Sequence, residues 1–295
     1  MDWNLFRSKA LRLKTGLPEK LILNNKDKTV TQENYIISGG IKGRERLKII
    51  AQVMARDTNQ LLDCVGIKSG MACLDAGCGG GDVTCELARR VGQTGTVVGL
   101  DMDQVKLDIA RQEAKEQNCT NVEFHYADIS KAQGKAEFDR VYARFLLTHL
   151  QDPLDALLRL QSFLKPGGVG IFEDIDFSGY YTYPESEAHT KHCTLYAQAV
   201  RSRGGDPNIG QRLPVLVQQA GFKKIQIQIV QPVALEGDVK LITPITMENI
   251  AETVLEEGLA SQEEVDAIVR KLYAFAYNTE TVAGFPRIVQ VWGTC

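Results

Sequence analysis

Four glycines fall within five positions of the segment LDAGCGGGDVT, residues 74–84, directly after a short apolar run. Glycine costs backbone entropy, so such a cluster predicts a tight turn or a backbone that a ligand approaches closely. Between a strand and a helix, the loop also places the first N–H groups of the helix beside that ligand. Carboxylates flank the glycines on both sides, as Asp75 and Asp82. We therefore expect a ligand-binding loop here.

The residue at position 82 limits the choice of ligand. A dinucleotide fingerprint that starts at Gly77 and Gly79 requires glycine at position 82, where this chain has Asp82. No Gly-Lys-Ser/Thr triplet follows, so a phosphate loop of the nucleotide-triphosphatase type is not indicated. A carboxylate at a helix N-terminus repels a pyrophosphate but suits an ammonium group. The loop therefore favours an amino-acid-bearing nucleoside such as S-adenosylmethionine over a dinucleotide.

The elements around the loop alternate regularly between strand and helix patterns. Apolar, β-type runs occupy residues 71–76, 96–101, 122–128, 138–143 and 168–174, and helical spacing occupies 83–91, 104–117 and 154–164 between them. This alternation predicts a doubly wound α/β sheet, which binds ligands at the carboxyl ends of its strands. Asp103, Asp152 and Ser261 are expected to begin helices as N-caps.

The ordered motifs resemble class I S-adenosylmethionine-dependent methyltransferases over roughly residues 60–235 and the last strand. The segment LDAGCGGGD resembles motif I of this family, an acid followed by glycines at alternate positions. The segments VVGLDMD and HYADIS resemble the family motifs at the ends of the second and third strands. The resemblance implies a Rossmann-like sheet of seven strands, the last (287–293) antiparallel, with a helical cap. It also implies S-adenosylmethionine as cofactor, with the ribose on Asp101 and the adenine beside Met102, Asp128 and Ile129. The motif I residues that match are Asp75, Gly77, Gly79 and Gly81.

The chemistry of the acids at the strand ends supports a ligand-binding role independently of the resemblance. A carboxylate can accept hydrogen bonds from two vicinal hydroxyls, as the ribose role of Asp101 requires. The alternative for Asp101, Asp103 and Asp128 is capping of the helices that follow. We assign Asp103 to capping and the other two to the ligand, and Asp82 to the methionine ammonium.

The fourth strand and the segment after it supply the candidates for catalysis. Arg144 lies at the strand tip, where it would hold the methionine carboxylate or an anionic substrate, with a surface salt bridge as the alternative. His149 would act as a general base or bond the cofactor, with a packed structural role equally open. Tyr35, upstream of motif I, is a candidate to cover the cofactor as part of a lid.

Substrate contacts are expected outside the sheet. Tyr180, Tyr181 and Tyr183 offer aromatic walls with hydroxyl groups, and His189 lies on the next predicted helix, 185–203. The alternative places these tyrosines in a core or an interface. Glu173, Asp174 and Asp176 lack a fourth-strand carboxylate to complete a metal site, so no metal is predicted.

Composition sets the remaining expectations. A net charge of −3 does not favour binding to nucleic acid or to an anionic membrane. The seven cysteines are scattered and form no Cys-x-x-Cys pair, which indicates reduced thiols in the cytoplasm. A homodimer is the assembly considered. The predicted domains are a helical cap or lid at 1–60, a cofactor-binding core at 61–237, a helical insertion at 238–284 and the final strand at 285–295.

These observations predict methyl transfer to an oxygen, nitrogen or carbon atom of a small molecule. Two alternatives stay open: a protein that binds S-adenosylmethionine without methylating, such as a cyclase or regulatory subunit, and a nicotinamide-dependent oxidoreductase, which Asp82 disfavours.

Overall fold

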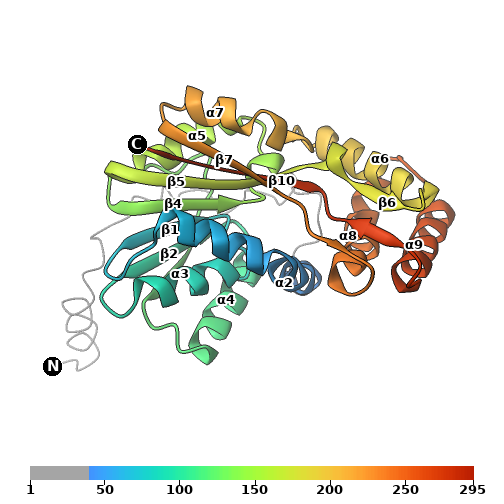
Figure 1. Cartoon of the computed structure of the whole chain (residues 1–295), viewed down its shortest axis with the longest axis horizontal. Coiled ribbons are helices and arrows are strands. Elements are labelled where there is room, and N and C mark those ends of the chain that lie inside the picture. The colour runs from blue at the N-terminus through green and yellow to red at the C-terminus, as the bar shows by residue number, and fades with distance from the viewer. Residues whose placement is uncertain (1–39) are drawn as a thin grey trace.

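A seven-stranded sheet forms the centre of the computed structural model, which describes residues 40–295 (Figure 1). Its strand order is β3-β2-β1-β4-β5-β10-β7, and β10 alone runs antiparallel to its neighbours. The predicted doubly wound sheet with an antiparallel last strand is therefore confirmed. The strands are β1 (Ala72–Ala76), β2 (Thr96–Asp101), β3 (Val122–Tyr126), β4 (Phe138–Arg144), β5 (Leu164–Asp176), β7 (Lys223–Val230) and β10 (Arg287–Thr294).

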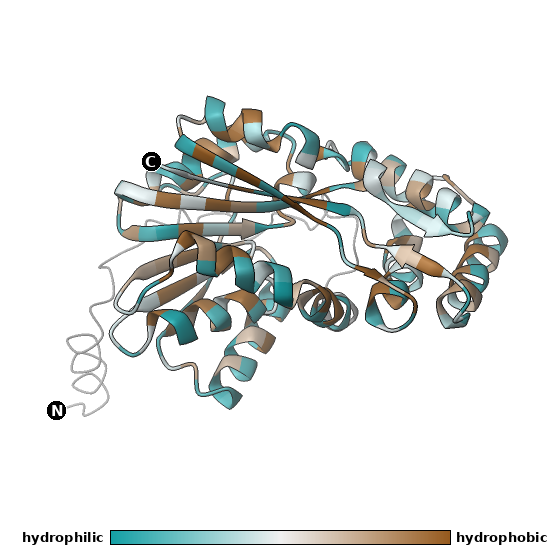
Figure 2. Cartoon of the chain, in the orientation of Figure 1, coloured by the Kyte–Doolittle hydropathy of each residue, from teal (hydrophilic) through white to brown (hydrophobic). Residues whose placement is uncertain are grey.

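Helices cover both faces of this sheet, because successive strand residues point to opposite sides. Cys73 belongs to the core beneath α2 (Gly40–Val65), α3 (Asp82–Val91) and α4 (Gln104–Glu116). The next residue, Leu74, belongs to the core beneath α5 (Pro153–Ser162) and α7 (Leu213–Gln219). Figure 2 shows the apolar residues concentrated along the central strands, with polar residues on the outer surfaces of the helices.

A second body of structure lies beyond the carboxyl ends of the strands and is called the cap here. It contains α6 (Glu187–Ser202), α8 (Asp238–Glu256) and α9 (Gln262–Tyr277), whose apolar faces form a third core with residues of α2, β5 and β10. Figure 1 shows the cap at one end of the sheet. The cap also contains a small antiparallel sheet that the sequence pattern did not predict, made of β6 (Tyr181–Tyr183), β9 (Val282–Gly284) and β8 (Val233–Ala234).

Local signals place several helix ends where expected. The Asp103 carboxylate accepts from the Lys106 N–H, and Asp152 caps α5 with Pro153 in its first turn. Ser261 and Glu264 form a reciprocal capping box on α9. Three 3₁₀ turns, η2 (Leu147–His149), η3 (Phe177–Gly179) and η4 (Ile209–Gln211), complete the described elements.

The structure also locates the predicted domain limits. The limit at residue 60 falls inside α2, which continues without interruption to Val65. The predicted insertion contains α8, α9 and β9, and β10 follows it. Within residues 40–295, no helix combines the length and the hydropathy needed to cross a membrane.

A buried lysine joins segments of the cap. The Lys240 side chain on α8 is 1% exposed, and its Nζ lies 2.6–3.0 Å from four oxygens: the carbonyls of Leu235, Asn278 and Thr281 and the Thr281 hydroxyl. These oxygens satisfy the buried ammonium and hold the chain after α9 against the start of α8.

Replacing Lys240 with methionine is expected to lower the free energy of unfolding by about 2–4 kcal/mol, because several buried carbonyl groups lose a charged donor. Chemical denaturation measures the change. Lys271→Met, on the exposed face of α9, is the matched control and is expected to stay within about 0.5 kcal/mol of the parent. Equal stabilities for the two variants would contradict the assigned role.

Candidate active site

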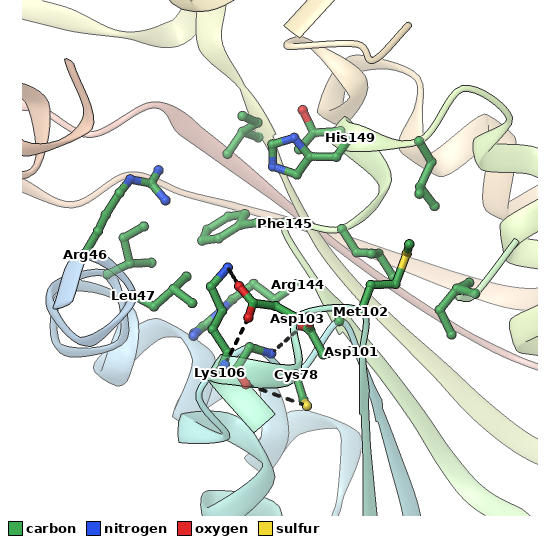
Figure 3. A pocket seen from close by; sticks show the side chains of 18 of the residues that line it. Arg46, Leu47, Cys78, Asp101, Met102, Asp103, Lys106, Arg144, Phe145 and His149 are labelled. Atoms are coloured by element: carbon green, nitrogen blue, oxygen red, sulfur yellow. Dashed lines mark hydrogen bonds and ion pairs between the residues drawn. The ribbon is translucent and has the colours of Figure 1, made fainter. Parts of the chain in front are cut away.

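A cavity of about 770 Å³ lies between the carboxyl edge of the sheet and the cap. Its volume is in the range of small-molecule sites, roughly 300–1,000 Å³. The glycine loop and the ends of β2 and β4 line one side, and residues of α2, η2, α6 and α8 line the other. Figure 3 shows the two sides, with Asp101 and Cys78 near the loop and Arg46 and His149 across the cavity.

The glycine loop is held by its own backbone. The N–H groups of Gly77 and Cys78 donate to the Leu100 carbonyl at 2.8 and 2.9 Å. Gly77, Gly79 and Gly81 have φ angles of 70°, 52° and 80°, a region that favours glycine. The predicted tight turn is thus present, and it engages the N–H groups of Gly77, Cys78 and Gly79. Their N–H groups bond within the protein, because the turn folds back onto the end of β2.

Asp101 closes the second strand and links the loop to the next helix. One carboxylate oxygen accepts from the Gly79 N–H at 2.8 Å, and the other accepts from the Asp103 N–H at 2.9 Å. A carboxylate oxygen has capacity for more than one hydrogen bond. Asp101 lines the cavity with the neighbouring Met102, whose side chain is 38% exposed.

Residues at the end of the third strand lie on the same side. Asp128 accepts from the N–H and the hydroxyl of Ser130 at 2.9 and 2.6 Å, and it pairs with Lys131 at 3.4 Å. Ile129 is buried and also lines the cavity. The structure therefore brings together the four residues assigned to ribose and adenine.

The two acids of the glycine segment have different environments. The Asp75 carboxylate is buried and accepts from the Thr84 hydroxyl at 2.6 Å, and burial raises its pKa to about 6. Asp82 forms a two-point ion pair with Arg44 of α2, at 2.6 and 2.9 Å. Its charge is thus engaged by a guanidinium, a partner the sequence did not reveal because Arg44 lies 38 residues away.

Arg44 also fastens α2 over the loop. Besides Asp82 it binds Glu113 of α4, which Lys48 contacts at 2.8 Å. A Cβ atom on Gly80 would overlap the Arg44 side chain, so glycine at position 80 allows this close approach. The Arg44 guanidinium therefore joins α2, the glycine loop and α4.

Arg144 points into the cavity near the loop. Its side chain donates to the Thr58 hydroxyl at 3.1 Å, and no carboxylate lies within ion-pair distance of it among residues 40–295. Thr58 in turn donates to Glu173 at 3.0 Å. Glu173 also accepts from Tyr142 and from Gln290, so this buried acid is satisfied by three neutral donors.

The other two acids of the fifth strand also have internal partners. Asp174 accepts from the N–H groups of Leu147 and Thr148 at 2.9 and 3.2 Å, which fixes the turn that carries His149. Asp176 accepts from the hydroxyl of Ser178 at 2.6 Å. Within the described part of the chain, no group of three or more His, Cys, Asp or Glu side chains is arranged to hold a metal ion.

His149 lines the cavity on the cap side (Figure 3). Burial, assisted by the charges of Arg46 and Lys106, lowers the pKa of this imidazole to about 3. The ring is therefore neutral at neutral pH, but a pKa so far below 7 makes it a weak general base.

The candidates for substrate contact are separated by the fold. Tyr180 lines the cavity, and its hydroxyl bonds that of Thr243. Tyr181 and Tyr183 are 44% and 70% exposed and do not line it, because they lie on strand β6 at the outside of the cap. Of the three tyrosines expected to form a substrate wall, the structure therefore places only Tyr180 at this cavity. His189 is also placed away from the cavity lining, packed edge-on against Phe275 at 4.5 Å. Tyr35 lies outside the described residues.

Sequence reasoning missed several cavity residues of the cap side: Arg46, Phe177, His192, Tyr196 and Thr246. His192 lies three residues after His189 on α6, and this helical spacing was a usable signal. Arg46 lies in a run of charged residues, and nothing in that run indicated a cavity residue.

A family model described as a methyltransferase domain matches residues 67–233, more than half of the chain. The ubiquinone biosynthesis O-methyltransferase of Acinetobacter baylyi is 32% identical over 120 residues, which cover 40% of this chain and 49% of the relative. The demethylmenaquinone methyltransferase of Staphylococcus aureus is 35% identical over 106 residues, 36% of this chain and 43% of the relative. The chain thus spans about half the length of the curated relatives it matches.

Solved structures show the same fold at low sequence identity. A Bacillus halodurans protein is 18% identical, with a TM-score of 0.55 over 81% of this chain and 98% of the other. The YcgJ protein of Bacillus subtilis is 16% identical, with a TM-score of 0.53 over 80% and 96%. The fold and the glycine loop define a class I methyltransferase domain. The chain belongs to the methyltransferase-domain family, as the sequence motifs predict.

The buried histidines make stability depend on pH. Burial, with a contribution from Lys240, lowers the pKa of His189 to about 4. An unfolded imidazole binds its proton near pH 6.5, so between pH 6.5 and 4 the unfolded chain holds more protons and stability falls as pH falls. His189→Asn should lessen this loss by about 1–2 kcal/mol at pH 5 relative to pH 7.5.

Urea unfolding at the two pH values measures the difference. His125→Asn is the matched control, because this histidine is exposed on β3. A His189 variant that loses as much stability on acidification as the parent would contradict this prediction.

Proposed function

We propose that this chain transfers a methyl group from S-adenosylmethionine to an oxygen, nitrogen or carbon atom of a small molecule. The observation that carries the proposal is the cavity at the carboxyl edge of the sheet, where the glycine loop and the fixed Asp101 carboxylate face a cap with aromatic and cationic side chains. The family match and the names of the relatives support methyl transfer.

The residues present fit the cofactor. At Gly77 and Gly79 the loop has no side chains, and an added Cβ would press on Leu146 or Leu47 at 3.0 or 2.8 Å. Asp101 is oriented by two backbone N–H groups and retains acceptor capacity for two ribose hydroxyls. Met102 and Ile129 supply apolar contacts for an adenine, and Asp128 supplies an acceptor for its amino group.

Arg144 is assigned to the methionine carboxylate. It lies beside the loop, lacks a carboxylate partner among residues 40–295, and is held by Thr58. Asp82 remains the acid nearest to the methionine ammonium in this proposal, with its charge shared by Arg44.

The bound cofactor supplies a methyl group that is already activated on a sulfonium. The protein then needs to align the acceptor atom in line with that methyl group and to exclude water. With the cofactor bound, an electron pair of the acceptor atom would form the new bond to the methyl carbon while sulfur would keep the pair of the carbon–sulfur bond, and the acceptor would lose a proton where it carries one. His149 is neutral and faces the cavity, so it can accept a hydrogen bond from the acceptor group.

Asp101→Ala is expected to weaken S-adenosylmethionine binding about 10- to 100-fold, because two charge-assisted hydrogen bonds to the ribose are lost. Calorimetry with S-adenosylmethionine and S-adenosylhomocysteine measures the affinity. Asp108→Ala, an exposed acid on α4, is the matched control with unchanged affinity expected. An unaltered affinity in Asp101→Ala would overturn the ribose assignment.

Turnover separates an enzyme from a binding protein. Incubation with S-adenosylmethionine and a metabolite extract should yield S-adenosylhomocysteine together with a methylated small molecule. Binding without any S-adenosylhomocysteine production would instead indicate a non-methylating role, and tight binding of NAD alone would indicate an oxidoreductase.

A further inference from the structure

A buried arginine on the cap side of the cavity has no anionic partner within the part of the chain that the structure describes. Arg46 is 8% exposed, and its Nε donates to the Thr246 hydroxyl of α8 at 3.0 Å. No ion pair joins it to any carboxylate among residues 40–295. A buried, uncompensated guanidinium is costly, and this cost is removed when an anion binds it.

Arg46 and Arg144 lie at different places in the cavity. Arg144 is bonded through Thr58 to the sheet, and its charge interacts with Asp75, Asp82 and Glu173 near the loop. Arg46 is bonded to the cap, and its charge acts on His149 and His192 instead. The proposed function assigns Arg144 to the methionine carboxylate, and this assignment leaves Arg46 for a second anionic molecule.

The same side of the cavity supplies an apolar wall and another unsatisfied polar atom. The rings of Phe177 and Tyr196 stack with centroids 4.1 Å apart, and Tyr180 stacks on Phe177 at 5.8 Å. His192 lines the cavity among these rings and is 1% exposed, and its Nδ1 has no hydrogen-bond partner among residues 40–295. Buried polar atoms without a partner are rare, and a ligand hydroxyl at this position would satisfy the ring.

The acidic residues that line this side are exposed or partly exposed rather than buried: Asp152, Asp155, Glu252 and Glu256. Glu252 and Glu256 of α8 are exposed, and Glu256 contacts Arg203 at 3.7 Å. Asp152 is exposed and caps α5. Exposed charges are screened by water, whereas the Arg46 guanidinium is not, so the interior charge decides which ligand is bound.

We propose that the cap side of the cavity is an acceptor subsite for a small anionic molecule, whose carboxylate or phosphate pairs with Arg46 and whose apolar body lies against Phe177, Tyr180 and Tyr196. This inference rests on the proposed function, because it names the class of methyl acceptor. A guanidinium binds both oxyanions through two parallel N–H donors, which a lysine does not reproduce.

The first test identifies the charge of the product. The purified chain is incubated with a metabolite extract and S-adenosylmethionine carrying a deuterated methyl group, and labelled products are separated by mass spectrometry. A labelled product with a carboxylate or a phosphate supports the proposal, and its composition distinguishes the two. A labelled product that is neutral or cationic overturns this inference but leaves methyl transfer intact. If no labelled product forms and S-adenosylmethionine does not bind, the proposed function itself fails.

The second test assigns the anion to Arg46. In Arg46→Gln, KM for the labelled acceptor should rise about 10-fold or more, while the affinity for S-adenosylhomocysteine stays within about twofold. Arg46→Lys keeps the charge without the two-point geometry, so an intermediate KM is expected. Arg212→Gln, a half-exposed arginine outside the cavity lining, is the matched control.

A third measurement needs no natural acceptor. The chain loaded with S-adenosylhomocysteine is titrated with benzoate, phenyl phosphate and the neutral benzamide. At least one of the two anions should bind at least about fivefold more tightly than benzamide, and Arg46→Gln should abolish this preference. An equal affinity for all three probes, or a preference that survives in Arg46→Gln, overturns the proposal. Melting temperatures of all variants show that each is folded.

Discussion

The Asp101 carboxylate is the contact on which the site depends, because it holds two backbone segments at once. It accepts from Gly79 in the glycine loop and from Asp103 at the start of α4, directly after β2 ends. The Leu100 carbonyl accepts from the two preceding N–H groups of the loop, those of Gly77 and Cys78. The turn is therefore shaped by the protein itself, and a ligand that enters meets a site already in place.

Closing the site from the other side requires α2 and the cap. Arg44 fastens α2 to the loop through Asp82 and to α4 through Glu113. Two residues further along the same helix, Arg46 bonds the cap through Thr246. One helix thus contacts both walls of the cavity, so a rearrangement of α2 would alter the loop and the acceptor side together.

Charged side chains inside the protein differ in whether the protein itself supplies all of their partners. Glu173 receives hydrogen bonds from Thr58, Tyr142 and Gln290, and Lys240 contacts four oxygens, so both are satisfied by the protein alone. Arg46 and Arg144 line the cavity, and within residues 40–295 each contacts a hydroxyl but no carboxylate. Because an unpaired buried charge costs stability, we propose that the Arg46 guanidinium is compensated by a ligand.

The sequence by itself determined the features that depend on neighbours along the chain. The alternation of strand and helix patterns predicted the doubly wound sheet, and the family resemblance added its antiparallel last strand. The glycine cluster predicted the tight turn, in which Gly77, Gly79 and Gly81 adopt positive φ angles. Helix caps at Asp103, Asp152 and Ser261 followed from the same local logic. Strand-end acids converged because parallel strands end at one edge of the sheet.

Tertiary structure alone decided which side chains meet across the cavity. Asp82 pairs with Arg44 of α2, a contact that no local pattern indicated. Tyr181 and Tyr183 do not line the cavity, because β6 joins a small sheet formed with a segment about a hundred residues later. Arg46 and Thr246 are 200 positions apart. No local pattern encodes such pairs, since they arise only when the packing of the apolar faces brings α2, the sheet and the cap together.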